Sequence, residues 1–326
     1  PRTGMARGWI LLVVSWVVLS AIGMVIAGEV ARRGAVVDLN RQAKASADLH
    51  AAVLRSELEK YRSLPLVLSQ DPAVVALLRS GKLTQDQAVS SKLEGLANQT
   101  RAAAIYVLDS RGSARAASNF REPTSFVGND YSFRPYFTDA RRSGNAEFFA
   151  LGTVSGRPGL YLARRIVEGD RFLGVVVVKV EFDALEADWR GSGEPAFVTD
   201  ARGVVLVTSV PDWRFRRSRP LTSEERRDIL KDQTLSPQAL APLPFQINDR
   251  ADTSERLAIG SGPVTDWILA TARTDTPGWT LGLLSPTGSA ISANVASARA
   301  VAGLLITLLA VAAGVMLRRR QQAVAK

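Results

Sequence analysis

One short stretch concentrates side chains that could bind a small anion: residues 129–137, with the sequence NDYSFRPYF. Arg134 is a permanent cation whose planar fork of donors fits a carboxylate in bidentate fashion. The hydroxyls of Tyr131, Ser132 and Tyr136 can donate hydrogen bonds to the same anion. The stretch indicates capture of a small organic acid. The alternative, which these residues taken alone favour, is a surface loop with one ordinary salt-bridged arginine.

A lysine within an apolar strand supplies a second candidate cation. Lys179 follows four valines in residues 173–182 (LGVVVVKVEF), and strand alternation places it on the same face as Val175 and Val177. If that face is buried, an unpaired ammonium there is costly, and a bound anion would remove the cost. Two alternatives stay open: Lys179 lies on the solvent face, or it pairs with a carboxylate of the chain itself.

A turn of small and hydroxylic residues lies between the two cations in the sequence. Residues 149–156 (FALGTVSG) are typical of a strand that ends in a turn centred on Gly152 and Thr153. Thr153 and nearby backbone N–H groups could add donors to the same ligand. Tyr161 follows on the next strand, where ligand contact and packing within the sheet are equally good interpretations. Two cations in one module suit an anion with two charged ends.

The sequence offers no pattern for catalysis or for a metal. Cysteine is absent and His50 is the single histidine, which excludes thiolate chemistry and multi-histidine metal sites. Glu181, Asp183 and Glu186 lie near a strand end, where capping is the better interpretation than paired catalytic carboxylates. We therefore expect no catalytic residue, no metal and no cofactor in this chain. The net charge of +10 is scattered along the chain, which argues against nucleic acid as a partner.

Two uncharged apolar stretches frame the chain. Residues 9–28 are long enough, as a helix, to cross a hydrocarbon core of about 30 Å, and residues 300–317 form a second such stretch. Basic flanks of a span tend to stay in the cytoplasm. We expect residues 1–8 and the basic tail 318–326 to be cytoplasmic. Residues 29–299 are then periplasmic in a chain anchored in a bacterial inner membrane.

Between the two stretches, the pattern changes from helical to β. Residues 29–99 show apolar side chains at three- and four-residue steps, which predicts a long stalk helix and a helical lead-in. Residues 100–190 show the alternation of antiparallel strands. Residues 193–285 repeat that order of strands and turns, and a connector at 286–299 follows. Four positions recur at a spacing of 91 residues: Asp109 and Asp200, Arg111 and Arg202, Gly112 and Gly203, Ser118 and Ser209.

Together, residues 129–137, 149–159 and 174–179 resemble the periplasmic sensor region of the C4-dicarboxylate sensor histidine kinases of the DctB type, which are double Cache (tandem PAS-like) sensors. The resemblance implies an α+β fold: two tandem PAS-like modules with antiparallel sheets behind a long N-terminal helix, flanked by two transmembrane helices. It implies a membrane-distal module at 100–190 that binds the ligand and a membrane-proximal module at 193–285 that lacks one. The residues implied to contact succinate, fumarate or malate are Tyr131, Ser132, Arg134, Thr153 and Lys179.

The same resemblance implies a larger signalling protein. Family members continue into a phosphotransfer helix and an ATP-binding domain, whereas this chain stops at Lys326. We expect it to be the sensory half of such a kinase, with ATP required only by the missing part. The expected partners are the dicarboxylate, the membrane, a second copy of the chain, a cognate response regulator and a dicarboxylate transporter. The alternatives are the sensory domain of a chemoreceptor or other transmembrane receptor for amino acids or other small carboxylates, and a scaffold without a ligand.

Overall fold

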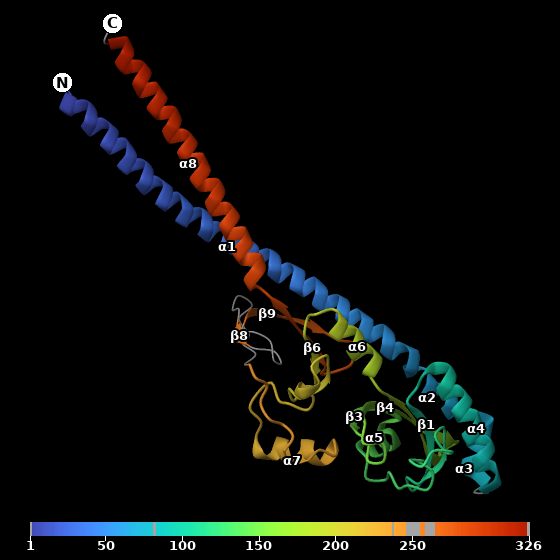
Figure 1. The fold of residues 1–326 in the computed structure, drawn as a ribbon. Coiled ribbons are helices and arrows are strands. Elements are labelled where there is room, and N and C mark those ends of the chain that lie inside the picture. Colours follow the sequence, from blue (N-terminus) through green and yellow to red (C-terminus); the bar gives the residue numbers. More distant parts are fainter. Residues whose placement is uncertain (1, 81–82, 237, 246–254, 258–264, 325–326) are drawn as a thin grey trace. The chain divides into compact units, whose positions relative to one another are not determined.

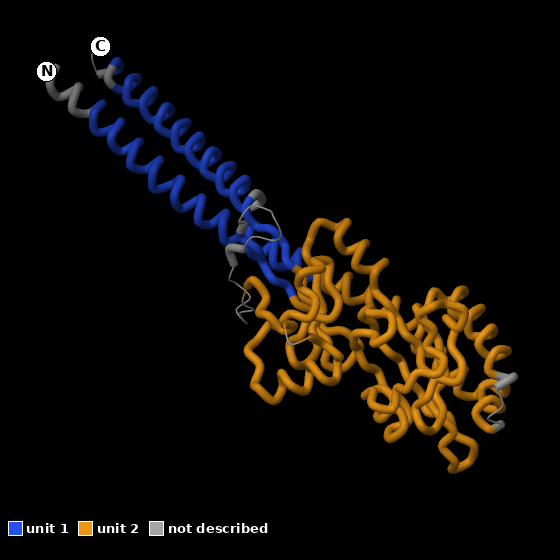
Figure 2. Tube along the Cα trace, turned by 60° about the horizontal axis from the view of Figure 1, so that its bottom comes forward, with its two compact units in different colours: residues 1–46, 248–270, 284–326 blue, residues 47–247, 271–283 orange. Residues whose placement is uncertain are grey.

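The computed structural model of the chain describes residues 2–80, 83–236, 238–245, 255–257 and 265–324. Helices and antiparallel strands make up the described part (Figure 1). The α+β class predicted from the sequence is confirmed. Parts of the predicted tails and of the predicted module at 193–285 lie outside the described residues. Figure 2 colours two compact units: residues 1–46, 248–270 and 284–326, and residues 47–247 and 271–283.

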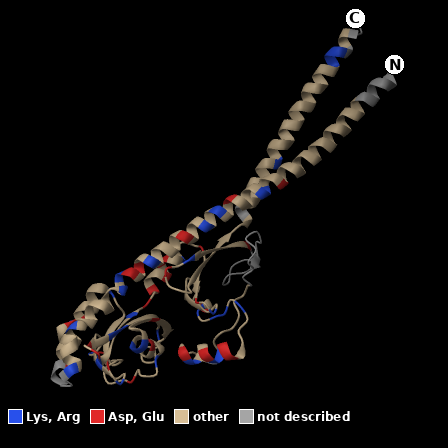
Figure 3. Cartoon of the chain, turned by 180° about the vertical axis from the view of Figure 1, so that it is seen from behind, with Lys and Arg blue, Asp and Glu red and all other residues tan. Residues whose placement is uncertain are grey.

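Two long helices carry the apolar stretches. Helix α1 is Arg2–Arg62 and helix α8 is Gly288–Val324. Each contains a segment that is long and apolar enough to cross a membrane, judged by length and composition. Figure 3 shows these segments almost free of charged residues up to the basic end of α8. The chain ends lie at the same end of the helix pair (Figure 1), which agrees with two spans and termini on one side.

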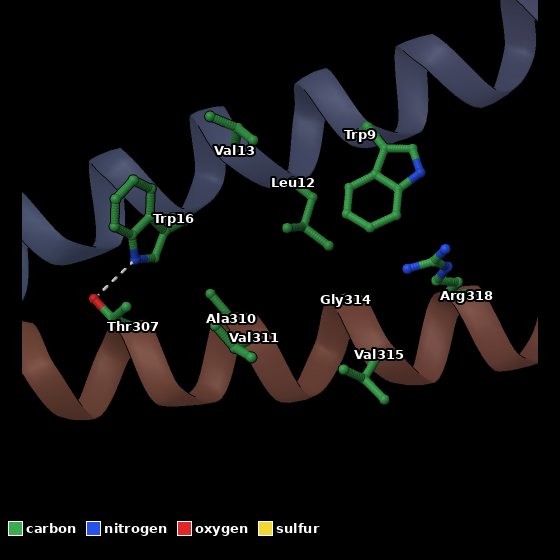
Figure 4. A pocket seen from close by; sticks show the side chains of 10 residues that line it. All are labelled: Trp9, Leu12, Val13, Trp16, Thr307, Ala310, Val311, Gly314, Val315 and Arg318. Atoms are coloured by element: carbon green, nitrogen blue, oxygen red, sulfur yellow. Dashed lines mark hydrogen bonds between the residues drawn. The ribbon is translucent and has the colours of Figure 1, made fainter.

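A groove separates the two apolar segments (Figure 4). The indole N–H of Trp16 on α1 donates a hydrogen bond of 3.3 Å to the hydroxyl of Thr307 on α8. A side chain on Gly23 would meet Ile306 at 2.4 Å, so glycine allows the helices to approach there. The lining of the groove is almost wholly apolar and belongs to the segments expected in the membrane. It is therefore no site for a small polar ligand.

Short helices follow α1, as the sequence predicted. Helix α2 is Leu64–Ser69, α3 is Pro72–Ser80 and α4 is Leu83–Thr100. The break between α1 and α2 falls just before Pro65, because proline removes a helix hydrogen bond and clashes with the preceding turn. Asp71 caps α3: its Oδ1 accepts the backbone N–H groups of Ala73 and Val74, at 3.0 and 3.3 Å.

The first sheet has five antiparallel strands in the order β2-β1-β5-β4-β3. The strands are β1 (Ala104–Asp109), β2 (Ala114–Ala117), β3 (Asn145–Leu151), β4 (Pro158–Glu168) and β5 (Arg171–Val180). One face of the sheet is an apolar core with Tyr106, Tyr136, Val175 and Val177. Helices α3 and α4 contact the sheet elsewhere: Leu78 lies against Gly174, and the Ser90 hydroxyl accepts from the backbone N–H of Ala117.

Helix α5, Pro135–Ser143, is an element that the sequence analysis did not predict. It begins at Pro135, whose fixed φ suits the first position of a helix and whose missing N–H costs nothing there. Tyr136, Phe137 and Ala140 form its buried face. Arg134 is the residue just before the helix, in an extended conformation. The second half of the stretch 129–137 is therefore helical, and Arg134 lies at the positive end of a helix.

The second sheet has the strand order β7-β6-β10-β9-β8, which matches the first sheet element for element. Its strands are β6 (Ala196–Thr199), β7 (Val205–Thr208), β8 (Glu255–Leu257), β9 (Thr265–Arg273) and β10 (Thr280–Pro286). Helix α6, Asp183–Gly191, joins the two sheets. The turn η1, Pro211–Trp213, and helix α7, Ser223–Asp232, precede β8. The cap of α7 is Thr222, which forms a reciprocal capping box with Glu225.

The motif that occurs twice, at a spacing of 91 residues, makes the same contacts in both sheets. Asp109 Oδ1 accepts the backbone N–H groups of Arg111 and Ser113 at 2.9 and 3.1 Å. The equivalent Asp200 accepts those of Arg202 and Val204 at 3.0 and 2.8 Å. The turn glycines have φ values of +90° at Gly112 and +79° at Gly203, in the left-handed region that favours glycine. Below, the first module means α5 with β1–β5, and the second module means α7 with β6–β10.

Candidate functional site

Arg134 is buried and has unused hydrogen-bonding capacity. Its side chain is 1% exposed. Nη1 donates to the hydroxyl of Thr234 at 2.6 Å, and Nη2 donates to the carbonyl of Leu151 at 2.8 Å. Nε is buried without a partner. No carboxylate of the described residues pairs with Arg134, so the alternative of an ordinary salt-bridged surface arginine does not hold.

Arg134 borders a small cavity with a volume of about 10 Å³. The hydroxyl of Tyr131, another lining residue, is also buried without a partner. Burial raises the pKa of Tyr131 to about 12, against the opposing effect of Arg134, so the phenol keeps its proton near neutral pH. Buried donors without partners are costly, and an acceptor inside the cavity would satisfy both. The residues that line the cavity are Tyr106, Phe126, Tyr131, Arg134, Gly152, Thr153, Val154 and Tyr161.

Stacked tyrosines form the wall behind this cavity. Tyr136 on α5 stacks on Tyr161 on β4, with ring centres 4.9 Å apart and planes at 13°. The hydroxyl of Tyr106 on β1 donates to the hydroxyl of Tyr136 at 2.8 Å. Burial raises the pKa of all three tyrosines. The wall is therefore neutral and held by packing, and Tyr136 supports the cavity from behind rather than lining it.

Lys179 is as buried as Arg134, but its donors are occupied. It is 1% exposed and lies opposite Ala104 on β1 and Tyr161 on β4, on the face that alternation predicted. Its Nζ donates to Glu181 Oε1 at 2.5 Å, to Ser155 Oγ at 2.9 Å and to the carbonyl of Arg157 at 3.1 Å. Burial lowers the pKa of Lys179, and the contact with Glu181 opposes that effect. In this structure Lys179 thus pairs with a carboxylate of the chain, the second of the two alternatives.

The turn at 151–157, between β3 and β4, contacts both cations. Its first residue, Leu151, gives a carbonyl to Arg134, and its later residues Ser155 and Arg157 give acceptors to Lys179. At Gly152 the backbone of the turn lies close to Ser155, Arg157 and Tyr161. A Cβ there would lie 2.3 Å from Ser155 Oγ and 3.1 Å from Tyr161 Oη, so only glycine fits without displacing its neighbours. Thr153, also on this turn, is exposed and lines the cavity.

Most of the predicted site residues are brought together. Around one cavity lie Tyr131, Arg134, Gly152, Thr153 and Tyr161, with Tyr136 behind them and Lys179 at 5.9 Å from the ring centre of Tyr161.

Ser132 is not among the residues that line the cavity. Its hydroxyl donates to Asp130 Oδ2 at 3.1 Å, and its backbone N–H donates to Asp130 Oδ1 at 2.8 Å. Its main chain packs on Gly112, where an added Cβ would lie 2.6 Å from the Ser132 Cα. Ser132 therefore helps to hold the loop in place in this structure.

Sequence reasoning missed several residues of the site. Tyr106 faces the cavity from β1, and its alternation with Leu108 could have indicated it. Phe126 and Val154 also line the cavity, but as apolar residues they did not stand out in the sequence as ligand contacts. Thr234 belongs to the second module and lies 100 residues beyond Arg134 in the sequence, so nothing local connected the two.

Comparisons with known proteins agree with this fold. Residues 31–293 match the Cache domain family (dCache_1). The C4-dicarboxylate transport sensor protein DctB of Rhizobium meliloti (strain 1021) is 43% identical over 324 residues, which are 98% of this chain and 52% of that protein. The chain thus spans about half the length of that relative.

Solved structures show the same architecture. The DctB histidine kinase sensor domain of V. cholerae aligns with a TM-score of 0.69 and 27% identity, over 76% of this chain and 97% of that one. The ligand-binding domain of the Pseudomonas fluorescens chemoreceptor CtaA, in complex with L-isoleucine, aligns with a TM-score of 0.55 and 16% identity, over 80% and 98% of the two chains. The latter similarity concerns the fold alone. The resemblance inferred from the site motifs is confirmed, and the chain belongs to the Cache domain family.

Proposed function

We propose that this chain is the extracytoplasmic sensor part of a sensor histidine kinase that binds a C4 dicarboxylate (succinate, fumarate or malate) in the cavity beside Arg134. The observation that carries the proposal is a pair of unsatisfied donors, Arg134 Nε and the Tyr131 hydroxyl, on residues that line one cavity. A carboxylate accepts hydrogen bonds from such donors, and its negative charge offsets the positive charge of the buried guanidinium. The R. meliloti relative, 43% identical, is named as a C4-dicarboxylate sensor, which supports the same ligand class.

One carboxylate of the ligand binds Arg134 in this proposal. Nε and a remaining N–H of the guanidinium form a two-donor edge, while the bonds to Thr234 and Leu151 stay in place. The Tyr131 hydroxyl adds a third donor. The second carboxylate is directed across the turn at 151–157 toward Lys179. Because the donors of Lys179 are occupied, this carboxylate takes the place of one present acceptor, and the turn shifts as it does so.

Transmission across the membrane follows from the long helices. We place residues 29–299 in the periplasm and the two apolar segments in the bacterial inner membrane. A ligand shifts a signalling equilibrium only through its different affinities for two states, and the shift of the turn supplies such a difference. Kinase activity, a response regulator, dimerisation and contact with a dicarboxylate transporter belong to the longer protein in this proposal, because the chain spans 52% of its relative.

A chemoreceptor for amino acids is the less favoured function. An amino-acid ammonium requires an acceptor, most often a carboxylate. No Asp or Glu is among the residues that line the cavity, and the nearby Glu181 already pairs with Lys179. The chemoreceptor domain with L-isoleucine is 16% identical, a level that supports the fold and no ligand.

Calorimetric titration of the full chain in lipid nanodiscs tests the proposal. We expect succinate, fumarate or malate to bind one per chain, and isoleucine and alanine to give no heat. Arg134→Ala should weaken binding by at least about 30-fold, because it leaves a desolvated carboxylate without its charged partner. Arg142→Ala is the matched control: Arg142 lies on α5 of the same module, pairs with Asp139 and is 78% exposed. Absence of heat with every C4 dicarboxylate, or unweakened binding in Arg134→Ala, contradicts the proposal.

A further inference from the structure

A residue of the second module touches the guanidinium of Arg134. Thr234 follows α7, and its hydroxyl accepts the hydrogen bond from Arg134 Nη1 at 2.6 Å. Its neighbour Gln233 accepts the backbone N–H of Leu151 with its carbonyl, at 3.1 Å. Leu151 in turn gives its carbonyl to Arg134 Nη2 at 2.8 Å. The four residues close a ring of hydrogen bonds that joins the anion-binding arginine to the end of β3 and to the second module.

The backbone at Thr234 is in an uncommon conformation. Its φ is +59°, in the left-handed region that β-branched residues rarely adopt. The N–H of Thr234 donates to the carbonyl of Lys231, and the N–H of Leu235 donates to the carbonyl of Leu230. These bonds wind the chain tightly at the end of α7. Glycine or asparagine would adopt this conformation with less strain, so the threonine is notable for the hydroxyl that it presents to Arg134.

The bonds to Thr234 and Leu151 leave the ligand-facing edge of Arg134 open. Guanidinium has five N–H donors in one plane, and two bonds made by Nη1 and Nη2 fix the orientation of that plane. Nε takes part in neither bond and remains unpaired. Thr234 therefore does not compete for the Nε edge.

We infer that Thr234 is a positioning residue for ligand recognition, supplied to the binding site of the first module by the second module. It holds the Arg134 guanidinium so that Nε and its neighbouring N–H meet a carboxylate of the ligand. The inference rests on the proposed function, since it names a further residue of that same site. It also gives the second module a part in sensing: ligand binding and docking of residues 233–235 strengthen each other reciprocally.

Three substitutions in the full chain, in nanodiscs, test this role by calorimetric titration with succinate. Thr234→Val keeps the β-branched shape and the backbone preference but removes the acceptor. We expect about a tenfold rise in Kd, the loss typical of one hydrogen bond to a charged group. Thr234→Ser keeps a hydroxyl and should restore affinity to within about threefold of the unsubstituted chain, a difference below 1 kcal/mol.

Thr222→Val is the matched control. It makes the same change in the same module, but Thr222 caps α7 through Glu225 and does not contact Arg134. We expect a lower melting temperature from the lost cap and no more than about a twofold change in Kd, well under 1 kcal/mol. Equal weakening by Thr222→Val and Thr234→Val would overturn the inference, because the effect would then come from general loss of stability in the second module.

The remaining outcomes separate this inference from the proposed function. Succinate binding with unchanged affinity in Thr234→Val overturns the role of Thr234 and leaves the proposed function standing. A Thr234→Ser chain that binds as weakly as Thr234→Val also overturns it, because the hydroxyl would not be the cause. If the unsubstituted chain binds no C4 dicarboxylate, the proposed function fails and the inference fails with it.

Discussion

At the scale of single residues, two buried cations of the first module have different environments. Lys179 has its charge balanced by Glu181 and its other donors occupied. Arg134 has a polar partner on two of its nitrogens and none on Nε. A buried charge without a counter-ion is costly, and the cost is removed when a ligand brings the opposite charge. In the proposed function, Arg134 is therefore the cation whose charge the ligand balances, and Lys179 is the cation that exchanges an acceptor for it.

The charge of Lys179 predicts how affinity changes with pH. Burial lowers its pKa below the ordinary 10.5, so its charged fraction falls as pH rises from neutral toward 10.5. A dicarboxylate is already fully ionised there. We expect Kd for succinate to rise over this window, as measured by titration calorimetry at increasing pH. The contribution of Lys179 to the free energy of unfolding should rise with pH over the same window, because the unfolded lysine holds its proton more tightly than the folded one.

Lys179→Met is the control for that prediction. Methionine fills similar space without charge, so the variant should bind succinate more weakly at neutral pH and lose the dependence on pH. An identical slope in both proteins would mean that another group titrates, and Lys179 would have no part in recognition.

Much of the site could be predicted from single residues, and the reason is chemical. An arginine beside hydroxyls and a lysine among valines stand out in any sequence, because both residue types are costly to bury without partners. The pairing of Lys179 with Glu181 and the distance of Ser132 from the cavity depend on side-chain directions that spacing does not determine. The contact from Thr234 depends on how two modules dock, for which the sequence between them carries no local signal.

At the scale of elements, α5 and the turn at 151–157 position the residues of the candidate site: Arg134 directly precedes α5, and Gly152 and Thr153 belong to the turn. The sequence analysis predicted no helix after Arg134, whereas Pro135 is the first residue of α5. The short helix has only one apolar face, and its three buried positions are too few for a clear helical period. By contrast, the long strands of the first module and the stalk were predictable, because their patterns repeat over many residues.

Gly152→Ala tests whether the turn must keep its present shape. The added Cβ would overlap Ser155 Oγ at 2.3 Å and would crowd Tyr161 Oη and the Arg157 carbonyl, both at 3.1 Å. Overpacking of this kind costs about 1–3 kcal/mol. We expect a lower free energy of unfolding in urea and weaker succinate binding, because both cations lose their present contacts with the turn.

The matched control is Gly191→Ala, at the end of α6, where an added Cβ meets nothing within 4 Å. That change should leave both measurements unaltered within error. If Gly152→Ala binds succinate as well as the unsubstituted chain does, then the turn is not part of the recognition site.

At the scale of the whole molecule, the two modules share a topology but differ at the position of Lys179. The recurring motif makes Ile105 equivalent to Ala196. Ile105 pairs with Val178 on β5, and Ala196 pairs with Leu283 on β10. The position equivalent to Lys179 is then Leu284, an apolar residue. The lysine at this position is thus particular to the first module, which agrees with our proposal that the second module contributes Thr234 to the site of the first.

A second link between the modules passes through the stalk helix. Arg62, at the end of α1, donates to both carboxylate oxygens of Glu147 on β3, at 3.0 and 3.2 Å. It also donates to the hydroxyl of Thr276, in the turn between β9 and β10, at 2.9 Å. One side chain therefore joins the stalk, the first module and the second module. Removing it should cost about 1–3 kcal/mol, the range for hydrogen bonds that involve charged groups.

Arg62→Ala should also make the two modules unfold separately. The chain carries its own probes: all five tyrosines lie in α1 or the first module, whereas tryptophans 189, 213, 267 and 279 lie beyond it. With Trp9 and Trp16 replaced by phenylalanine, tyrosine absorbance reports the first module and tryptophan fluorescence reports the part that follows.

In the otherwise unsubstituted chain we expect the two urea transitions to coincide, as one cooperative unit requires. In Arg62→Ala they should separate, and adding Thr234→Val should widen the gap, because each change removes side-chain hydrogen bonds that join the two modules. Arg79→Ala, which breaks only the pair with Glu168 inside the first part of the chain, should leave the transitions coincident. Separate transitions before any link is removed would show that the modules are independent, and neither Arg62 nor Thr234 could then carry a signal between them.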